Sequence, residues 1–183
     1  MARELITFKT KDVRANIGSI PSKIMIPATV RALNKVAGNV RTASSRAVRA
    51  RRGLPASAVN KSMVIVRANR SKLRSSLVVR GRPIGLKDYK ARQTRKGVTV
   101  EVTRGQRKLV GSAFIVQTLS GHVFTREGRA RLPITKMVGP SIPGTFLQEE
   151  VRQAWLTVAK DAMVKRSAEE LRYELSKLRK KGV

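Results

Sequence analysis

The sequence predicts an α+β fold, in which a long N-terminal helix and C-terminal helices pack on a small antiparallel β-sheet that carries a long basic loop. Two stretches with apolar residues at helical spacing flank a middle region of short β-branched runs, separated by glycine and proline. Hydrophobic residues make up 41% of the chain, which is typical of a protein with a core rather than of a disordered tail. At 183 residues, we expect a single domain over 1–183.

The first helix is predicted over residues 27–52, after a weakly patterned segment 1–26 in which Ile6-Thr7-Phe8 fits a short strand or a helix start. Pro27 suits a first helical turn. Cations in the last turn and Gly53 at the C′ position favour an end of the helix there. The apolar residues at three- and four-residue spacing are Val30, Leu33, Val36, Ala37, Val40, Ala43, Ala47 and Val48.

A β-rich region is predicted over residues 63–135, after a short helix from Pro55 to Ser62. Met63–Ala68 and Leu77–Arg80 are rich in β-branched residues, and 98–103 alternates apolar and polar residues, so one face is expected to be buried and the other wet. Residues 81–97 lack periodicity and carry six basic residues against one acid. This segment is therefore expected to be a long, exposed basic arm.

C-terminal helices are predicted over residues 145–181. Thr145-x-x-Gln148 and Ser167-x-x-Glu170 both fit capping boxes, so we expect two helices with a bend near Lys165-Arg166. Leu147, Val151, Trp155, Val158 and Ala162 form an apolar stripe on the first helix, and Ala168, Leu171, Leu175 and Leu178 follow at heptad-like spacing on the second.

Positive charge is the strongest compositional feature of the chain. Forty Lys and Arg against eleven Asp and Glu give a net charge of +29, and the 75 residues between Asp12 and Asp88 hold 17 basic side chains and no acid. A basic face kept only for solubility normally mixes both signs of charge. Because such a stretch repels itself, a polyanion or an acidic protein is expected beside it.

The candidate contact residues for DNA or an acidic partner are the clustered cations of this half of the chain. They are Arg46, Arg49, Arg51, Arg52, Arg70, Lys72, Arg74, Lys87, Lys90, Arg92, Arg95 and Lys96. Base-stacking modules need exposed aromatics among their cations, and here only Tyr89, between Lys87 and Lys90, has such a position. Contact with a DNA backbone, independent of base sequence, and contact with an acidic protein both remain open.

Sequence features for catalysis or cofactor binding are scarce. The chain has no cysteine and a single histidine, His122, beside a predicted turn, where a structural or surface role is expected. No Gly-x-Ser-x-Gly, P-loop or Gly-x-Gly-x-x-Gly motif occurs. We therefore expect a protein that is not an enzyme and binds no cofactor or metal.

The N-terminus lacks the apolar region of a signal peptide, and no run of apolar residues is long enough to span a bilayer. We therefore expect cytoplasmic synthesis and no membrane partner.

Four short sequence motifs, in this order along the chain, resemble those of the phage minor tail protein Z family, the tail-completion proteins of long-tailed phages. They are Gly111-Ser112-Ala113-Phe114-Ile115, Gly121-His122-Val123-Phe124-x-Arg126, Gly128-x-x-Arg131-Leu132-Pro133-Ile134 and Gly139-Pro140-Ser141-Ile142-Pro143. With the basic helix end and basic arm before them, the resemblance covers about residues 30–150. Gly111-Ser112 departs from the Pro-Gly common in relatives, which alters a turn.

The resemblance implies a virion protein of the tail or neck that completes the head-proximal end of the tail, and no catalytic residues come with it. It implies a homo-oligomeric ring, expected to be hexameric, beside tail terminator, tail tube and head-connector proteins, with a role in placing the genome end before ejection. Structural turns are expected at Gly111, Gly121, Gly128, Pro133, Gly139, Pro140 and Pro143. The alternative is a sequence-independent nucleic-acid-binding protein of the ribosomal or nucleoid type.

Overall fold

The computed structural model describes residues 3–8 and 21–180, and it confirms the α+β fold class. The chain divides into two compact units. Unit 1 holds 1–2, 45–62 and 80–151, and unit 2 holds 3–44, 63–79 and 152–183.

The described helices and strands differ from the predicted ones mainly in number and bounds. The helices are α2 (Ser22–Arg51), α3 (Ala56–Lys61), α4 (Ile142–Phe146) and α5 (Glu149–Lys180), with short 3-10 turns η1 (Leu86–Asp88) and η2 (Gln117–Leu119). The strands are β1 (Arg3–Phe8), β2 (Met63–Val66), β3 (Ser75–Arg80), β4 (Arg92–Thr94), β5 (Gly97–Thr103), β6 (Gln106–Gly111), β7 (Ala113–Val116), β8 (His122–Arg126) and β9 (Ile134–Lys136). They form three three-stranded sheets instead of one.

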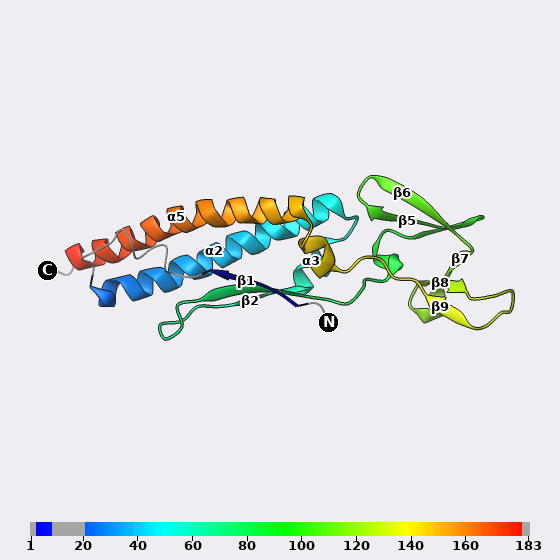
Figure 1. The fold of residues 1–183 in the computed structure, drawn as a ribbon, viewed down its shortest axis with the longest axis horizontal. Coiled ribbons are helices and arrows are strands. Elements are labelled where there is room, and N and C mark those ends of the chain that lie inside the picture. The colour runs from blue at the N-terminus through cyan, green and yellow to red at the C-terminus, as the bar shows by residue number, and fades with distance from the viewer. Residues whose placement is uncertain (1–2, 9–20, 181–183) are drawn as a thin grey trace. The chain divides into compact units, whose positions relative to one another are not determined.

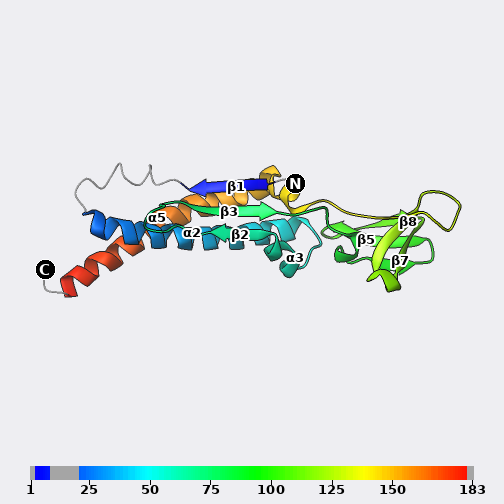
Figure 2. The same cartoon turned by 90° about the horizontal axis from the view of Figure 1, so that it is seen from below.

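Unit 2 is built around α2, which contacts a sheet on one side and α5 on the other (Figures 1 and 2). The sheet has the strand order β1-β3-β2, and β2 and β3 are antiparallel with Val64 opposite Val78. Asn34 of α2 binds the chain just after β2 twice, because its side-chain amide donates to the Ala68 carbonyl and its oxygen accepts from the Ala68 N–H. The apolar face of α2 is fully buried at Leu33, Val36 and Val40.

The start of α2 is a correction to the prediction. The helix begins at Ser22, five residues before the predicted start, so that Pro27 lies inside it. The N–H groups of Ile24 and Met25 both donate to the Pro21 carbonyl, at 2.9 and 3.1 Å. Pro27 has no backbone N–H, so the helix lacks one hydrogen bond in its second turn.

The C-terminal helices also differ from the prediction. A one-turn helix, α4, is capped by the Ser141 hydroxyl, which accepts from the Gly144 N–H. The following helix, α5, is continuous through Lys165-Arg166, so one helix stands where two were predicted. No proline or glycine interrupts residues 149–180, and a residue pair that fits a capping box does not end a helix that can continue through it. Arg166 pairs with Glu169 within the uninterrupted helix.

Unit 1 contains two sheets, each an antiparallel meander. In the order β4-β5-β6, Thr99 of β5 lies opposite Arg92 and Leu109, and in the order β7-β8-β9 Phe124 lies opposite Phe114 and Lys136. Val98, Val100, Ala113 and Val123 are buried. These sheets form the scaffold on which the predicted basic residues are arranged.

The predicted exposed arm, residues 81–97, is instead part of the fold of unit 1. It holds η1 and β4, and its Leu86 and Tyr89 are buried. The Tyr89 hydroxyl donates to the Pro140 carbonyl at 2.7 Å, and an ideal Cβ on Gly139 would lie 2.6 Å from the Tyr89 ring. Tyr89 is therefore a core residue and not an exposed base-stacking aromatic. The apolar partners that order this segment come from residues about 50 positions later, which local periodicity does not reveal.

Candidate interface for DNA or an acidic partner

The carboxyl end of α2 carries a cluster of exposed cations in unit 1, Arg46, Arg49 and Arg51. Helix carbonyls at this end lack partners within the helix. The turn between β5 and β6 supplies them, because the Arg104 N–H donates to the Arg51 carbonyl at 3.0 Å and its guanidinium reaches the Arg49 carbonyl at 3.4 Å. Arg104 therefore adds a further cation to the helix end, where positive charge also suits the helix dipole.

Gly53 follows the end of α2, but its φ is not positive, so it does not form the expected left-handed turn. Glycine fits here because the backbone of Glu101 lies close to it. An ideal Cβ at this position would lie 2.2 Å from the Glu101 carbonyl oxygen. A bridge between Arg52 and Thr103 continues the same contact, and the Arg52 guanidinium donates to Thr145 Oγ1 at 3.0 Å. Arg52 is thus a structural link in unit 1, whereas its neighbour Arg51 is exposed and pairs with Glu150 at 2.7 Å.

Glu101 is a nearly buried carboxylate among these cations. It was expected on the wet face of its strand, but the pairing of β5 with β6 shifts register between Val100 and Thr103, and Glu101 is only 9% exposed. Its carboxylate accepts from the Gly105 N–H at 3.1 Å and from Lys90 Nζ at 3.1 and 3.0 Å. The Gly105 hydrogen bond and then Lys90 lower the pKa of Glu101. This carboxylate therefore fixes Lys90 and the turn that presents Arg104.

The hairpin of β4 and β5 presents three more of the predicted cations, Arg92, Arg95 and Lys96, all exposed. Its turn is closed by polar side chains, because the Gln93 amide and the Thr94 hydroxyl both donate to the Gly97 carbonyl. The Gln93 oxygen also accepts from the Ile115 N–H at 2.8 Å, which ties the hairpin to β7. The cations thus sit on an ordered hairpin whose shape does not depend on them.

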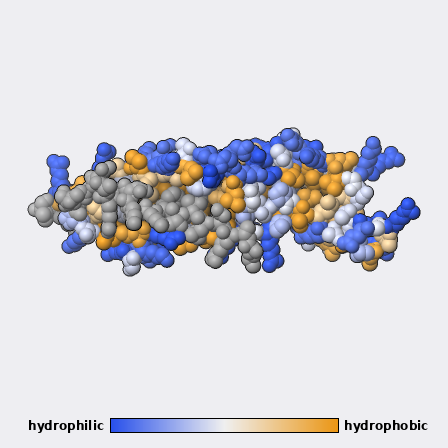
Figure 3. Space-filling model, in the orientation of Figure 1, coloured by the Kyte–Doolittle hydropathy of each residue, from blue (hydrophilic) through white to orange (hydrophobic). Residues whose placement is uncertain are grey.

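The remaining predicted cations do not join this cluster. Arg70, Lys72 and Arg74 are exposed in the loop between β2 and β3 of unit 2. Lys87, on η1 of unit 1, donates to the Ser120 carbonyl at 3.2 Å. Hydrophilic side chains cover much of the face drawn in Figure 3, with hydrophobic patches between them. The structure therefore brings together the α2 end, Lys90 and the β5–β6 turn, and it places the 70–74 loop in the other unit.

Several cations of unit 1 were missed by the sequence reasoning. Arg104, Arg107 and Lys108 are exposed on and beside the β5–β6 turn, and Arg107 donates to Thr99 Oγ1 at 3.3 Å. The turn itself was predicted, and its two arginines flanking Gly105 were the available signal. Arg129 and Arg131 are exposed in the loop after β8, and Arg126, the last residue of β8, lies 5.0 Å from the centre of the Phe114 ring.

The residues expected to form turns have varied surroundings. Gly121 has a φ of 67° after Ser120 at 57°, a left-handed pair that suits glycine. Gly111 ends β6, Gly128 and Pro133 lie between β8 and β9, and Pro143 is buried in α4. Gly139 and Pro140 contact Tyr89 as described above.

His122, the first residue of β8, lies beside a lysine of β9. Its Nε2 lies 3.2 Å from Lys136 Nζ, and partial burial and then the charges of Lys136 and Lys87 lower its pKa. Within residues 3–8 and 21–180, no group of three metal-binding side chains is arranged to hold an ion, and no helix there is long and apolar enough to cross a membrane.

Comparison with known families gives a match to the model described as prophage minor tail protein Z, over residues 11–181. The chain belongs to this family. Comparisons with curated proteins and with solved structures give no significant match. The resemblance to this family that the four motifs between Gly111 and Pro143 indicated is therefore confirmed, and the match extends over nearly the whole chain. As a minor tail protein, the chain is a structural component of the virion tail and contacts other virion components.

Proposed function

We propose that this minor tail protein is a ring-forming subunit that completes the head-proximal end of the tail for head–tail joining and helps to position the genome end. Family membership across residues 11–181 is the observation that carries this proposal. A closed ring, expected to be hexameric, fits the symmetry of a tail, because a head-to-tail interface that closes on itself gives cyclic symmetry. Its neighbours would be the tail terminator or tail tube and the head connector.

The clustered cations of unit 1 supply the physical part of the proposal. Arg46, Arg49 and Arg104 at the α2 end, and the Arg92–Lys96 hairpin, lie on ordered elements and are exposed. Repetition of a +29 chain around a ring would strengthen self-repulsion, which a DNA backbone or acidic neighbouring proteins would relieve. We infer that the hairpin cations contact one of these two, without reading base sequence.

Genetic complementation of a phage that lacks this chain tests the proposal. A variant with Arg92→Gln, Arg95→Gln and Lys96→Gln should yield few infectious particles while the purified subunit keeps its thermal unfolding midpoint. The matched control changes three exposed cations outside the predicted set, Lys23→Gln, Lys61→Gln and Arg67→Gln, and should support normal infectivity. Electron microscopy of the failed lysates should show separate heads and tails. Normal infectivity from the hairpin variant would refute the role of the hairpin.

A further inference from the structure

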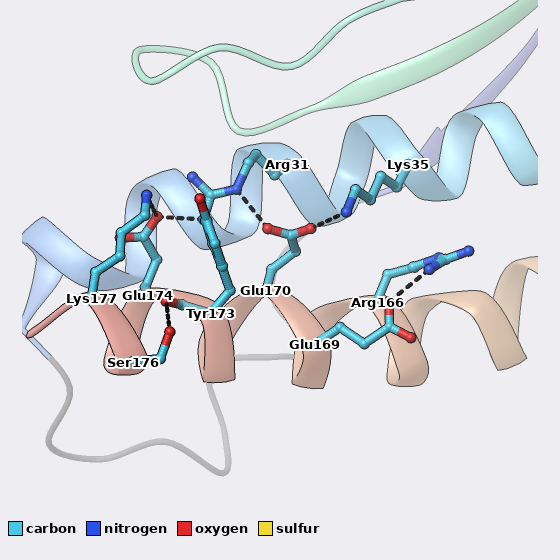
Figure 4. Close-up of polar contacts among 9 residues, drawn as sticks. All are labelled: Arg31, Lys35, Arg166, Glu169, Glu170, Tyr173, Glu174, Ser176 and Lys177. Atoms are coloured by element: carbon cyan, nitrogen blue, oxygen red, sulfur yellow. Dashed lines mark hydrogen bonds and ion pairs between the residues drawn. The ribbon is translucent and has the colours of Figure 1, made fainter. Parts of the chain in front are cut away.

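The carboxyl half of α5 has one polar face that contacts α2. Glu170 is 4% exposed, and it accepts from the Arg31 guanidinium and from Lys35 Nζ, each at 2.5 Å (Figure 4). One turn later, Glu174 pairs with both Arg31 and Lys177. Earlier in the helix the same face is apolar and buried, at Ala159 and Ala162. The ion pairs with α2 are therefore made by the carboxyl half of α5.

A separate apolar stripe runs along a different face of this half-helix. Its members repeat at alternating spacings of four and three residues, and they are Val164, Ala168, Leu171, Leu175 and Leu178. At 100° per residue, the stripe is centred roughly 100° around the helix axis from Glu170 and Glu174, the residues that contact α2. Val164 is 75% exposed and Leu175 is 46% exposed. Ala168 is exposed as well, whereas Leu171 and Leu178 are half-buried, so the open part of the stripe is formed by Val164, Ala168 and Leu175.

An exposed heptad stripe on a structural protein indicates a surface for another helix. The flank of the stripe determines what kind of helix fits, because residues beside an apolar seam select the partner by charge. Here Lys165, Arg172 and Arg179, each one residue after a stripe member and seven apart, form an exposed row of cations. A second copy would bring the same cations and a further +29 of charge, whereas an acidic helix would complement them.

We propose that the Val164–Leu178 face of α5 docks an amphipathic helix of another protein, one that presents an apolar heptad stripe flanked by Asp and Glu. The face spans 15 residues, about 22 Å of helix, which matches two heptads of a partner. The proposal concerns residues of unit 2 alone and requires neither the ring nor contact with DNA.

Binding of synthetic helical peptides to the full chain tests this surface. The probe is a three-heptad peptide with Leu at the a and d positions and Glu at e and g, measured by fluorescence anisotropy at 150 mM NaCl. It should bind at least about tenfold more tightly than a peptide with Lys at e and g, and its affinity should fall as salt rises. A third peptide keeps the Glu residues but has Ser at a and d. It should bind at least about tenfold more weakly than the probe, which separates docking from general attraction to a cationic protein.

Variants of the chain locate the binding. Val164→Glu with Leu175→Glu should weaken the acidic probe at least about tenfold, and the uncharged pair Val164→Ser with Leu175→Ser should weaken it in the same direction. The control is Leu119→Glu with Leu132→Glu, which changes two exposed leucines of unit 1 and should leave binding unchanged. Circular dichroism checks that each variant keeps its helix content. The Ser pair adds no charge and serves if the Glu pair fails to fold.

Three results would overturn the proposal. The first is equal binding of the acidic probe to the wild-type chain and to the folded Ser pair. The second is a Lys peptide that binds as tightly as the Glu peptide. The third is self-association of the chain in sedimentation velocity that is lost in the Ser pair and is not reduced by the acidic probe. In that case a second copy of the chain would occupy this face.

Discussion

Arg31 of α2 and Glu170 of α5, which are 139 residues apart in sequence, form an ion pair between the two helices, with Nε 2.5 Å from Oε2. Glu170 also accepts from Lys35, so one nearly buried carboxylate binds two successive turns of α2. Arg31 lies 5.2 Å from the centre of the Tyr173 ring as well (Figure 4). This pairing fixes which face of α5 contacts α2, and consequently which face is left for a partner.

Replacement of Glu170 by Gln should destabilise the chain. It removes the negative charge that two cations share, and we expect a loss of about 1–2 kcal/mol in the free energy of unfolding. The cost of breaking a buried ion pair is reduced here because the Arg31 and Lys35 side chains are 34% and 53% exposed. Urea denaturation at pH 7 measures this loss in the free energy of unfolding. The control Glu169→Gln removes a half-exposed pair with Arg166 between adjacent turns of one helix and should cost below about 0.5 kcal/mol. Equal effects of the two variants would contradict this account.

Acid should weaken the same contact. Burial alone would raise the pKa of Glu170, but hydrogen bonds from Lys35 and Arg31 outweigh it, so its pKa is lowered, and the hydrogen bond from Arg31 lowers that of Glu174. A carboxylate with a depressed folded-state pKa stabilises the fold above its ordinary value of 4.5, and this contribution is lost as pH falls through the folded-state pKa. Unfolding free energies measured between pH 6 and pH 3 should therefore fall less steeply for Glu170→Gln than for the wild-type chain. Parallel curves would rule out this linkage.

The buried Tyr89 hydroxyl gives a prediction at high pH. Burial raises the pKa of Tyr89 to about 12 from 10.0. Folding thus favours the neutral phenol, and the stability that it contributes is complete below pH 10 and lost as pH rises to about 12. Tyr89→Phe loses the hydrogen bond to Pro140 and should cost about 1 kcal/mol at pH 7. It should also remove this alkaline loss of stability, which unfolding measurements at pH 8 to 11.5 would detect. An unchanged alkaline loss would show that Tyr89 is not responsible.

Contact with DNA through the backbone should give a steep dependence on salt and little dependence on sequence. The logarithm of the affinity for duplex DNA should fall linearly with the logarithm of salt concentration, by about 0.9 for each phosphate neutralised. Loss of Arg92, Arg95 and Lys96 should reduce that slope by up to about 3, while the Lys23, Lys61 and Arg67 control leaves it unchanged. No measurable binding to DNA at low salt would instead favour an acidic protein as the partner of the hairpin.

Local sequence patterns predicted the elements whose partners are near in sequence or whose apolar face is unambiguous. The apolar spacing in α2 places Leu33, Val36 and Val40 in the core, and β-branched runs mark β2 and β3. The start of α2 was harder to predict, because Pro27 is typical of a first helical turn although the helix begins at Ser22. Helix periodicity fixes the interior of a helix better than its ends.

The misplaced features depend on contacts distant in sequence. Tyr89 is ordered by Gly139 and Pro140, and Glu101 is turned inward by a register shift in β5. For α5, periodicity identified the Ala168–Leu178 stripe but not its partner, since Glu170 and Glu174 contact α2 instead. In the candidate interface, the sequence identified most of the cations, whereas their grouping around Glu101 and Arg104 required the fold.

Quantitative mass spectrometry of purified virions, compared with tails from a mutant that makes no heads, tests the central claim most directly. If the chain completes the head-proximal end of the tail, its peptides will be present in complete particles at a fixed small copy number per tail, expected to be about six for a hexameric ring. A phage without the chain will then produce heads and tails that stay apart. Complete, infectious particles that contain none of its peptides would contradict the account.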